Sequence, residues 1–262
     1  GGGGGGGGGT TYDYTTEYNN QPGLAMIGAS TANDAGYTGA GVKVSVVDTG
    51  IENSHSEFSG KDITGASYVA GKSYIDDVHG HGSHVAGIIA ANKNGTASTP
   101  GMRGVAYGVT RILSMRIGND AGSISLTDSN WASMIGSERT SSVDFSNNSW
   151  GSSTVEIDEI NSTWVNNNIP NTASAYQTGV SNDVVYVWAT GNNYGADPSY
   201  QSGLPDVVDN IESGWVAVMS VNNDKKETNY TQRCGDAAAW CVAAPGGGDT
   251  QSTEGIYSVK SS

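Results

Sequence analysis

An α/β fold with a mostly parallel, twisted sheet covered by helices on both faces is predicted by two features of the sequence. Short runs rich in β-branched residues alternate with segments of helical periodicity, which is the pattern of parallel strands joined by helical crossovers. Polar signatures follow several of these runs, where parallel strands would bring them to one edge of the sheet. The 262 residues suffice for one large domain with a sizeable core.

The expected elements follow in chain order. Residues 10–40 are polar, with one helix expected near 24–35, and a second helix at 82–91 places Val85, Ile88 and Ile89 at helical spacing. The strand-like runs are 42–47, 111–117, 143–148, 184–189 and 216–221. No internal repeat is visible, so one domain is expected.

The chain begins with nine glycines, Gly1 to Gly9. Such a run has no side chains to bury. We therefore assign residues 1–20 to a flexible glycine-rich tether with a polar leader, and residues 21–262 to the folded domain. No apolar run reaches membrane-spanning length.

The formal net charge is −14 and the pI is near 4.4. This balance argues against nucleic acids and anionic membrane surfaces as partners, because both repel an acidic protein. A solvated acidic surface explains the charge equally well.

Three polar signatures mark the predicted carboxyl edge of the sheet: Asp48-Thr49-Gly50, Asn148-Ser149-Trp150-Gly151 and Thr190-Gly191-Asn192. A carboxylate after a buried strand is fixed in place, and His81 opens the following helix, whose dipole favours a neutral imidazole. An aspartate that orients a histidine, with the histidine activating a hydroxyl, is the arrangement of serine hydrolases. Asn192 is a neutral amide donor suited to a developing oxyanion.

Each signature has a simpler reading when taken alone. An aspartate after a strand is often only a turn residue or a helix cap. His79, His81 and His84 form an HxHxxH pattern that could hold a metal, although no HExxH motif or further ligand at zinc-like spacing accompanies it.

Two cysteines, Cys234 and Cys241, are present in a chain without a CxxC motif. Their even number and close spacing suit one disulfide in an oxidising compartment. Two buried free thiols remain the alternative at this point.

Taken together, the motifs resemble the subtilase family of serine proteases. Val46-Val47-Asp48-Thr49-Gly50-Ile51 is similar to the family's aspartate motif, His81-Gly82-Ser83-His84-Val85-Ala86-Gly87 to its histidine motif, and Ala189-Thr190-Gly191-Asn192 to the strand bearing its oxyanion asparagine. The resemblance runs from about Gly36 to Lys260 and implies a subtilisin-like serine endopeptidase. Asp48 would orient the base, His81 would move the proton and Asn192 would hold the oxyanion.

The segments Arg233-Cys234-Gly235 and Trp240-Cys241-Val242-Ala243-Ala244-Pro245-Gly246 resemble the subtilase passenger domains of Gram-negative autotransporters. That resemblance implies a Cys234–Cys241 disulfide and a secreted or cell-surface protein at the outer membrane. It also allows membrane attachment through a lost translocator, or through a lipid-bearing cysteine ahead of the glycine run.

The resemblance further implies that protein or peptide substrates bind as an extended strand between two segments. One wall of the pocket would be Ser149-Trp150-Gly151 and the other Ala189-Thr190-Gly191. Trp150 would favour apolar or aromatic side chains in a neighbouring pocket, or would serve core packing alone. Asp76 and Asp77 resemble the acidic pair of kexin-type processors at a different offset, so strict dibasic specificity is not predicted.

The nucleophilic serine motif of subtilases is expected beyond Ile256-Tyr257-Ser258, but the sequence stops at Ser262. A nicked protease whose C-terminal fragment supplies the serine, a truncation, or an unrecorded remainder would each account for this. The fragment alone is then expected to be inactive, and a catalytically dead domain acting as a binding module is the rival interpretation. No cofactor is implied, although the family allows calcium, for which the sequence names no ligands.

Overall fold

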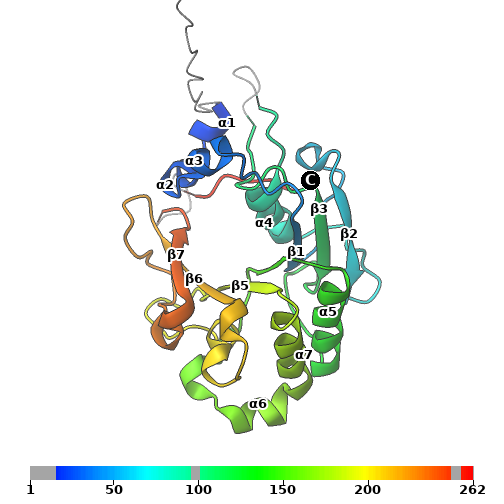
Figure 1. Ribbon diagram of the computed structural model, residues 1–262, viewed down its shortest axis with the longest axis vertical. Coiled ribbons are helices and arrows are strands. Elements are labelled where there is room, and N and C mark those ends of the chain that lie inside the picture. The colour runs from blue at the N-terminus through cyan, green and yellow to red at the C-terminus, as the bar shows by residue number, and fades with distance from the viewer. Residues whose placement is uncertain (1–15, 96–100, 249–254, 262) are drawn as a thin grey trace, which may run out of the picture.

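The computed structural model describes residues 16–95, 101–248 and 255–261. Seven strands form one sheet in the order β2-β3-β1-β4-β5-β6-β7, and every neighbouring pair is parallel (Figure 1). The predicted α/β class with a parallel sheet is confirmed. Because all strands run the same way, their carboxyl ends meet at one edge.

The strands are β1 (Lys43–Asp48), β2 (Asp62–Ser67), β3 (Arg111–Arg116), β4 (Phe145–Asn148), β5 (Val185–Ala189), β6 (Trp215–Val221) and β7 (Cys241–Pro245). The α-helices are α1 (Thr16–Asn19), α2 (Pro22–Met26), α3 (Ala29–Asp34), α4 (His81–Ala90), α5 (Asp128–Thr140), α6 (Ser162–Asn168), α7 (Pro170–Val180) and α8 (Tyr200–Gly203).

All five strands expected from the sequence are present, and the two that were missed are the edge strands β2 and β7. β2 contains Gly65, whose backbone lies so close to β3 that an added Cβ would stand 1.9 Å from the Ser114 carbonyl oxygen. β7 is rich in alanine and ends at Pro245, residues of low strand propensity. Pairing with an inner neighbour, rather than their own sequences, makes these segments strands.

The single helix expected near residues 24–35 is two helices, α2 and α3. Gly28 separates them with a left-handed backbone, at a φ of 69°. That conformation costs a glycine little but cannot continue a helix.

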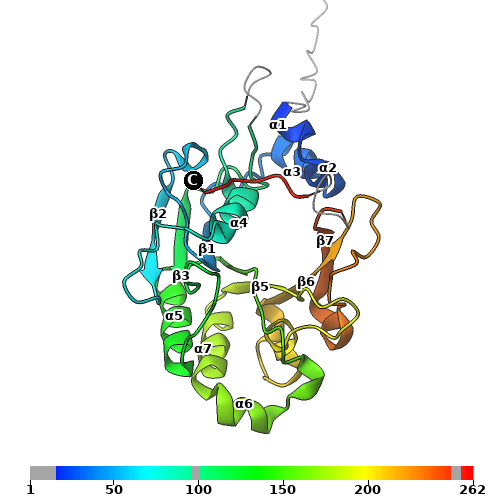
Figure 2. The same ribbon diagram turned by 180° about the vertical axis from the view of Figure 1, so that it is seen from behind.

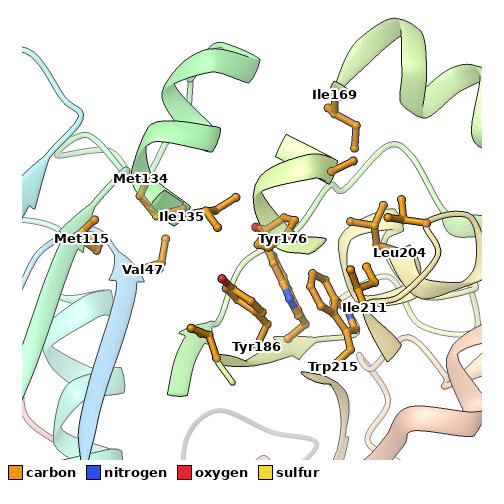
Figure 3. Packing of buried hydrophobic residues seen from close by; sticks show 14 of the residues in the cluster. Val47, Met115, Met134, Ile135, Ile169, Tyr176, Tyr186, Leu204, Ile211 and Trp215 are labelled. Carbon is orange, nitrogen blue, oxygen red and sulfur yellow. The ribbon is translucent and has the colours of Figure 1, made fainter. Parts of the chain in front are cut away.

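Side chains on β1 alternate between two cores. Val47 belongs to the larger core, where Met134 and Ile135 of α5 and Tyr176 of α7 pack against the sheet (Figure 3). Val46 belongs to the smaller core on the other face, under α4. Helices therefore cover β1 on both sides, and Figure 2 shows α4 and the α5–α7 pair on opposite sides of it.

Residues 16–19 were assigned to the leader, but they form helix α1 and pack onto the domain. Glu17 is 0% exposed, and Tyr18 packs with Leu24 and Ala29. The folded domain therefore begins before residue 21, because α1 has apolar neighbours that its own sequence does not reveal. The glycine run Gly1 to Gly9 lies outside the described residues. In the described parts of the chain, no helix has the length and apolar character to cross a bilayer.

Candidate active site

Asp48 and His81 lie together at the carboxyl edge of the sheet. Asp48 ends β1, and His81 is the first residue of α4, after Gly80 at the N-cap. The His81 Nδ1 atom is 2.8 Å and 2.9 Å from the two carboxylate oxygens of Asp48. Because a carboxylate only accepts, the proton belongs on Nδ1, and Nε2 keeps its lone pair. The Asp48 side chain is 3% exposed and that of His81 is 45% exposed. The imidazole of His81 is therefore held by a buried carboxylate on one side and is open to solvent on the other.

Two glycines allow this approach of strand and helix. A Cβ on Gly82 would lie 2.1 Å from the carbonyl oxygen of Gly50 and 3.1 Å from Cβ of Asp48. Gly50 has a φ of +113°, and a Cβ there would lie 2.2 Å from the Asp76 carbonyl oxygen. Glycine is therefore required at both places: at residue 82 for α4 to approach β1, and at residue 50 for the loop at Asp76 to lie against the end of β1.

The carboxylate of Asp77 stabilises the N-terminal end of α4 through hydrogen bonds. It is 1% exposed and accepts hydrogen bonds from the Thr49 hydroxyl at 2.7 Å, the Gly80 amide at 2.9 Å, and both the amide and the hydroxyl of Ser83 at 2.7 Å. Thr49 Oγ1 in turn accepts from the Gly82 amide at 3.0 Å. The sequence analysis did not recognise this role, although an aspartate ahead of a helix start is a capping signal.

The pKa of His81 is raised above its ordinary value. The hydrogen bond to Asp48 is the main cause and partial burial opposes it, while the charges of Asp48 and Asp77 add to the rise. The expectation that the helix dipole keeps this imidazole neutral therefore omits the larger effect, because a carboxylate at hydrogen-bond distance outweighs a helix terminus.

Of the three histidines of the HxHxxH pattern, His79 and His81 line the pocket at Asp48, whereas His84 does not. His84 Nε2 lies 3.2 Å from the carbonyl oxygen of Ile256, away from the bond between His81 and Asp48. Burial lowers the pKa of His84. Across residues 16–95, 101–248 and 255–261, no group of three or more His, Cys, Asp or Glu side chains is placed to hold a metal.

Asn192 is exposed just beyond the end of β5 and lines a groove together with Ser149, Trp150 and Gly151. Ser149 and Trp150 also line the adjoining pocket that contains Asp48 and His81. The structure thus places the predicted base and the predicted oxyanion donor on neighbouring stretches of one groove.

Ala189 and Gly191 line the Asn192 groove as well, whereas Thr190 is buried beneath it. The Thr190 hydroxyl donates to the backbone carbonyl oxygen of Gln232 at 2.8 Å, and the backbone amide of Gln232 donates to the backbone carbonyl of Gly191 at 3.0 Å. A Cβ on Gly191, whose φ is +127°, would lie 1.6 Å from Gln232 Oε1. Gln232, which the sequence analysis missed, therefore holds the turn that presents Asn192.

Trp150 takes part in both packing and groove formation. Its ring stacks on Trp131 with centroids 4.7 Å apart and meets Trp188 edge-on at 4.9 Å, while it also lines both pockets. The two interpretations offered for this residue are compatible, since one face of the ring packs and the rest borders the groove.

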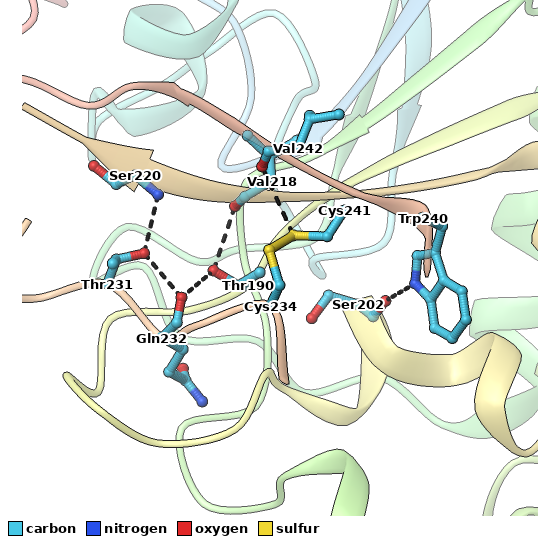
Figure 4. The surroundings of a disulfide bond; sticks show 10 residues. All are labelled: Thr190, Ser202, Val218, Ser220, Thr231, Gln232, Cys234, Trp240, Cys241 and Val242. Carbon is cyan, nitrogen blue, oxygen red and sulfur yellow. Dashed lines mark hydrogen bonds between the residues drawn. A yellow bond between two sulfur atoms is a disulfide. The ribbon is translucent and has the colours of Figure 1, made fainter. Parts of the chain in front are cut away.

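The two cysteines form a disulfide between residues 234 and 241, with Cα atoms 5.9 Å apart (Figure 4). The bridge joins the two ends of the turn that leads into β7. Trp240 Nε1 donates to the Ser202 carbonyl at 3.0 Å beside it. The disulfide expected from the resemblance is therefore present.

Two acidic side chains, the buried Glu17 and the half-buried Glu57, lie together beyond the C-terminal end of α4. Glu17 is 0% exposed and its Oε2 accepts from the Gly95 amide, while its Oε1 has no hydrogen-bond partner among the described residues. Burial and the charge of Glu17 raise the pKa of Glu57, whose carboxyl group is hydrogen-bonded to Asn94 and whose Oε2 likewise has no partner in the described parts of the chain. Unpartnered buried carboxylate oxygens beside an amide side chain match the oxygen ligands that Ca²⁺ prefers.

The parallel sheet, the Asp48–His81 pair and the adjoining groove agree with the arrangement expected of a serine hydrolase. The sequence profile of the subtilase family matches residues 39–261, and the chain belongs to that family. It is 32% identical over 213 residues to Subtilisin DY from Bacillus licheniformis, covering 80% of this chain and 67% of that protein. It is 29% identical to an extracellular serine protease from Serratia marcescens, covering 92% of this chain but 26% of that protein.

Solved structures show the same fold. A cold-adapted subtilisin-like serine proteinase superposes with a TM-score of 0.57 at 26% identity, covering 80% of this chain and 65% of that chain. The prenylagaramide maturation protease PagA gives a TM-score of 0.62 at 22% identity, covering 84% of this chain and 68% of that chain. The 262 residues therefore span about two-thirds of these structures.

Proposed function

We propose that this chain carries the base, the orienting carboxylate and the oxyanion donor of a serine endopeptidase. The observation that supports this most is the bidentate approach of Asp48 to His81 Nδ1, on the same groove as Asn192. Among the described residues, His81 Nε2 has no hydrogen-bond partner, so it is free to receive a proton.

In the proposed reaction, a serine Oγ attacks the carbonyl carbon of the scissile peptide bond while His81 Nε2 accepts the hydroxyl proton. Asp48 stabilises the imidazolium, and the Asn192 amide donates to the oxyanion. His81 then returns the proton to the leaving amine as the C–N bond breaks, which leaves an acyl-enzyme. Water, deprotonated by the same base, hydrolyses the ester.

We further propose that the serine comes from a C-terminal fragment of the same protease, outside these 262 residues. Phe145 and Val242, on strands β4 and β7, are 43% and 52% exposed. Phe145 also lines an apolar hollow with Val44, Ile89 and Val187. Apolar sheet surface of this kind requires a cover, and the serine-bearing segment would provide it.

The test is to treat the secreted, natively purified protein with a fluorophosphonate probe and to analyse it by denaturing gel and intact mass. Labelling of a second, smaller polypeptide that co-purifies with this one would support the proposal, as would labelling of a longer single chain. A natively purified protein that takes up no label, yet binds peptides, would support the rival, an inactive subtilase domain that acts as a binding module.

The substrate class proposed is protein or peptide, bound in extended form between the segments at Ser149–Gly151 and Ala189–Gly191. Main-chain pairing would supply most of the affinity with little sequence preference. The aromatic face of Trp150 favours an apolar or aromatic side chain in the pocket beside it.

We propose a calcium ion at Glu17, Glu57 and Asn94. The buried Glu17 and the half-buried Glu57 support it, because each has one buried carboxylate oxygen without a partner among the described residues, and the ion would neutralise charges that burial otherwise disfavours. Millimolar EDTA should lower the melting temperature by about 5–10 °C, as expected when an ion at about 100 times its Kd is removed. Glu17→Gln should abolish this calcium dependence and exposed Glu212→Gln should retain it; an EDTA-insensitive parent would exclude the ion.

We infer that the protein acts outside the cytoplasm, since the Serratia relative is an extracellular protease and the chain contains a disulfide. An autotransporter origin and attachment to a Gram-negative outer membrane remain proposals, with the glycine run as a tether behind an acylated cysteine. Reading the residue encoded before Gly1 and labelling cells with a palmitate analogue tests the anchor. A residue other than Cys, or an unlabelled protein, would favour a freely released protease.

A further inference from the structure

Arg116 is the last residue of β3 and its side chain is 0% exposed. Its guanidinium donates to the carbonyl oxygens of Ser73 at 3.0 Å, Asp76 at 2.7 Å and Gly118 at 3.2 Å. It also donates to Asp120 Oδ1 at 2.7 Å. One buried cation thus links two loops that are more than 40 residues apart in sequence.

Both loops border the pocket at His81, and they touch there, since a Cβ on Gly122 would lie 2.7 Å from His79 Nε2. Gly118, Ala121 and Gly122 line the pocket from a turn that the Asn119 side chain closes by accepting from two of its amides. His79 lines the same pocket and follows residues 73–76, the loop that Arg116 holds.

The chemistry of the side chain suits this link. A guanidinium presents five donors in a rigid planar fork, whereas a lysine ammonium is a single point of charge. Here four hydrogen bonds join the guanidinium to three carbonyl oxygens and to the Asp120 carboxylate, and the Asp76 carboxylate lies 3.7 Å away, so the buried charge is matched by acceptors and by two carboxylates. Lys72 holds Asp120 from the solvent side, which fixes the same turn a second time.

We propose that Arg116 is a positioning residue that holds both loops in place beside the His81 pocket, and thereby sets the affinity for extended peptides. It touches no reacting atom. The inference rests on the proposed protease function, because only a substrate long enough to extend past His81 along these loops would sense their position. Shorter substrates that reach only His81 and Asn192 should be indifferent to it.

The experiment compares Arg116→Lys with the parent in the complete protease, on a tetrapeptide amide and on a single acylated amino-acid ester. Arg116→Lys should raise KM for the tetrapeptide about tenfold with kcat nearly unchanged, and should leave kcat/KM for the ester within about twofold. Asp120→Asn, which loosens only the 118–122 loop, should give a smaller rise. The matched control is Arg111→Lys, an exposed arginine on the same strand that bonds the Gly41 carbonyl at 3.1 Å; it should match the parent.

Equal losses on the ester and the tetrapeptide, or unchanged kinetics on both, would overturn the inference. Hydrogen exchange provides a readout that does not depend on activity. In Arg116→Lys, amides of residues 73–80 and 118–124 should exchange faster together, while those of α5 and α7 stay protected. If the parent itself cleaves neither substrate, the protease proposal fails, and the exchange result alone decides whether Arg116 holds both loops.

Discussion

The two halves of the candidate site are built in different ways. The β1–α4 half holds Asp48 and His81 in a network of buried hydrogen bonds that includes four to the carboxylate of Asp77. The β5 half presents Asn192 from an exposed turn, which is held through the backbone of Gly191 and through Gln232.

The difference reflects what each half has to do. A general base needs a fixed ring orientation and a raised proton affinity, and both come from a buried carboxylate at hydrogen-bond distance. An oxyanion donor needs only to reach a charge that appears during the reaction, so its amide has to be open to the groove before substrate arrives. Changes in the first half should therefore cost more than changes in the second.

The largest expected effect is that of Asp48→Asn in the complete protease. Asparagine replaces the carboxylate by a neutral amide, so the Nδ1 proton loses its charged acceptor and the pKa of His81 falls, since the bond to Asp48 is the main cause of its rise. We expect kcat to drop by about 10⁴-fold. The acid limb of the pH–rate profile should move to lower pH, because that limb reports protonation of the base. Exposed Asp62→Asn is the control, and a loss below tenfold would show that Asp48 does not orient the base.

A smaller effect is expected for Asn192→Ala. Removing one oxyanion donor should lower kcat by about 10²–10³-fold and leave KM nearly unchanged, because the bond forms mainly in the transition state. Steady-state kinetics on a peptide amide measures this. The control is Asn182→Ala, at an exposed asparagine just after the C-terminal end of α7. A change in KM equal to the change in kcat would instead make Asn192 a substrate-binding residue.

A further prediction concerns Glu138, in the core beneath the sheet that carries both halves of the site. It lies fully buried under the sheet, where its Oε1 accepts from the Ser146 hydroxyl at 2.7 Å. Burial raises its pKa from 4.5 to about 7. The folded state therefore binds the proton more tightly than the unfolded state, and this contribution to stability is lost as pH rises from about 4.5 through about 7.

Denaturant unfolding at pH 5 and pH 8 measures this loss. The parent should lose about 2–3 kcal/mol more than Glu138→Gln over that interval. Exposed Glu212→Gln should behave like the parent. Identical pH dependence in all three proteins would mean that Glu138 does not titrate in this range.

The smallest effect on activity is expected from the disulfide, which lies beside the Asn192 half. Replacing both cysteines by serine should lower the free energy of unfolding by about 2–3 kcal/mol, because the bridge closes only a short loop. Since Gln232 keeps its bonds to Thr190 and Gly191, kcat should change less than in Asn192→Ala. A fall of kcat to the Asn192→Ala level would show that the bridge, rather than Gln232, positions the oxyanion turn.

The sequence by itself determined the fold class, the five inner strands and the motifs around Asp48, His81 and Asn192. These features are local: strand propensity, polar residues directly after a strand, and a histidine that begins a helix. The edge strands β2 and β7 were not predicted from the sequence, because their pairing depends on neighbouring strands. Helix α1 was not predicted because its apolar partners lie in α2 and α3.

Only the tertiary structure decided which distant residues support the site. Asp77, Gln232 and Arg116 act through buried hydrogen bonds to Thr49, Gly191 and Ser73, and no periodicity or motif encodes such partners. The direction of the His81 pKa was also decided there, because a carboxylate 2.8 Å away outweighs the helix dipole that the sequence had suggested. Local patterns specify elements and chemistry, whereas distances between elements set proton affinity and the shape of the groove.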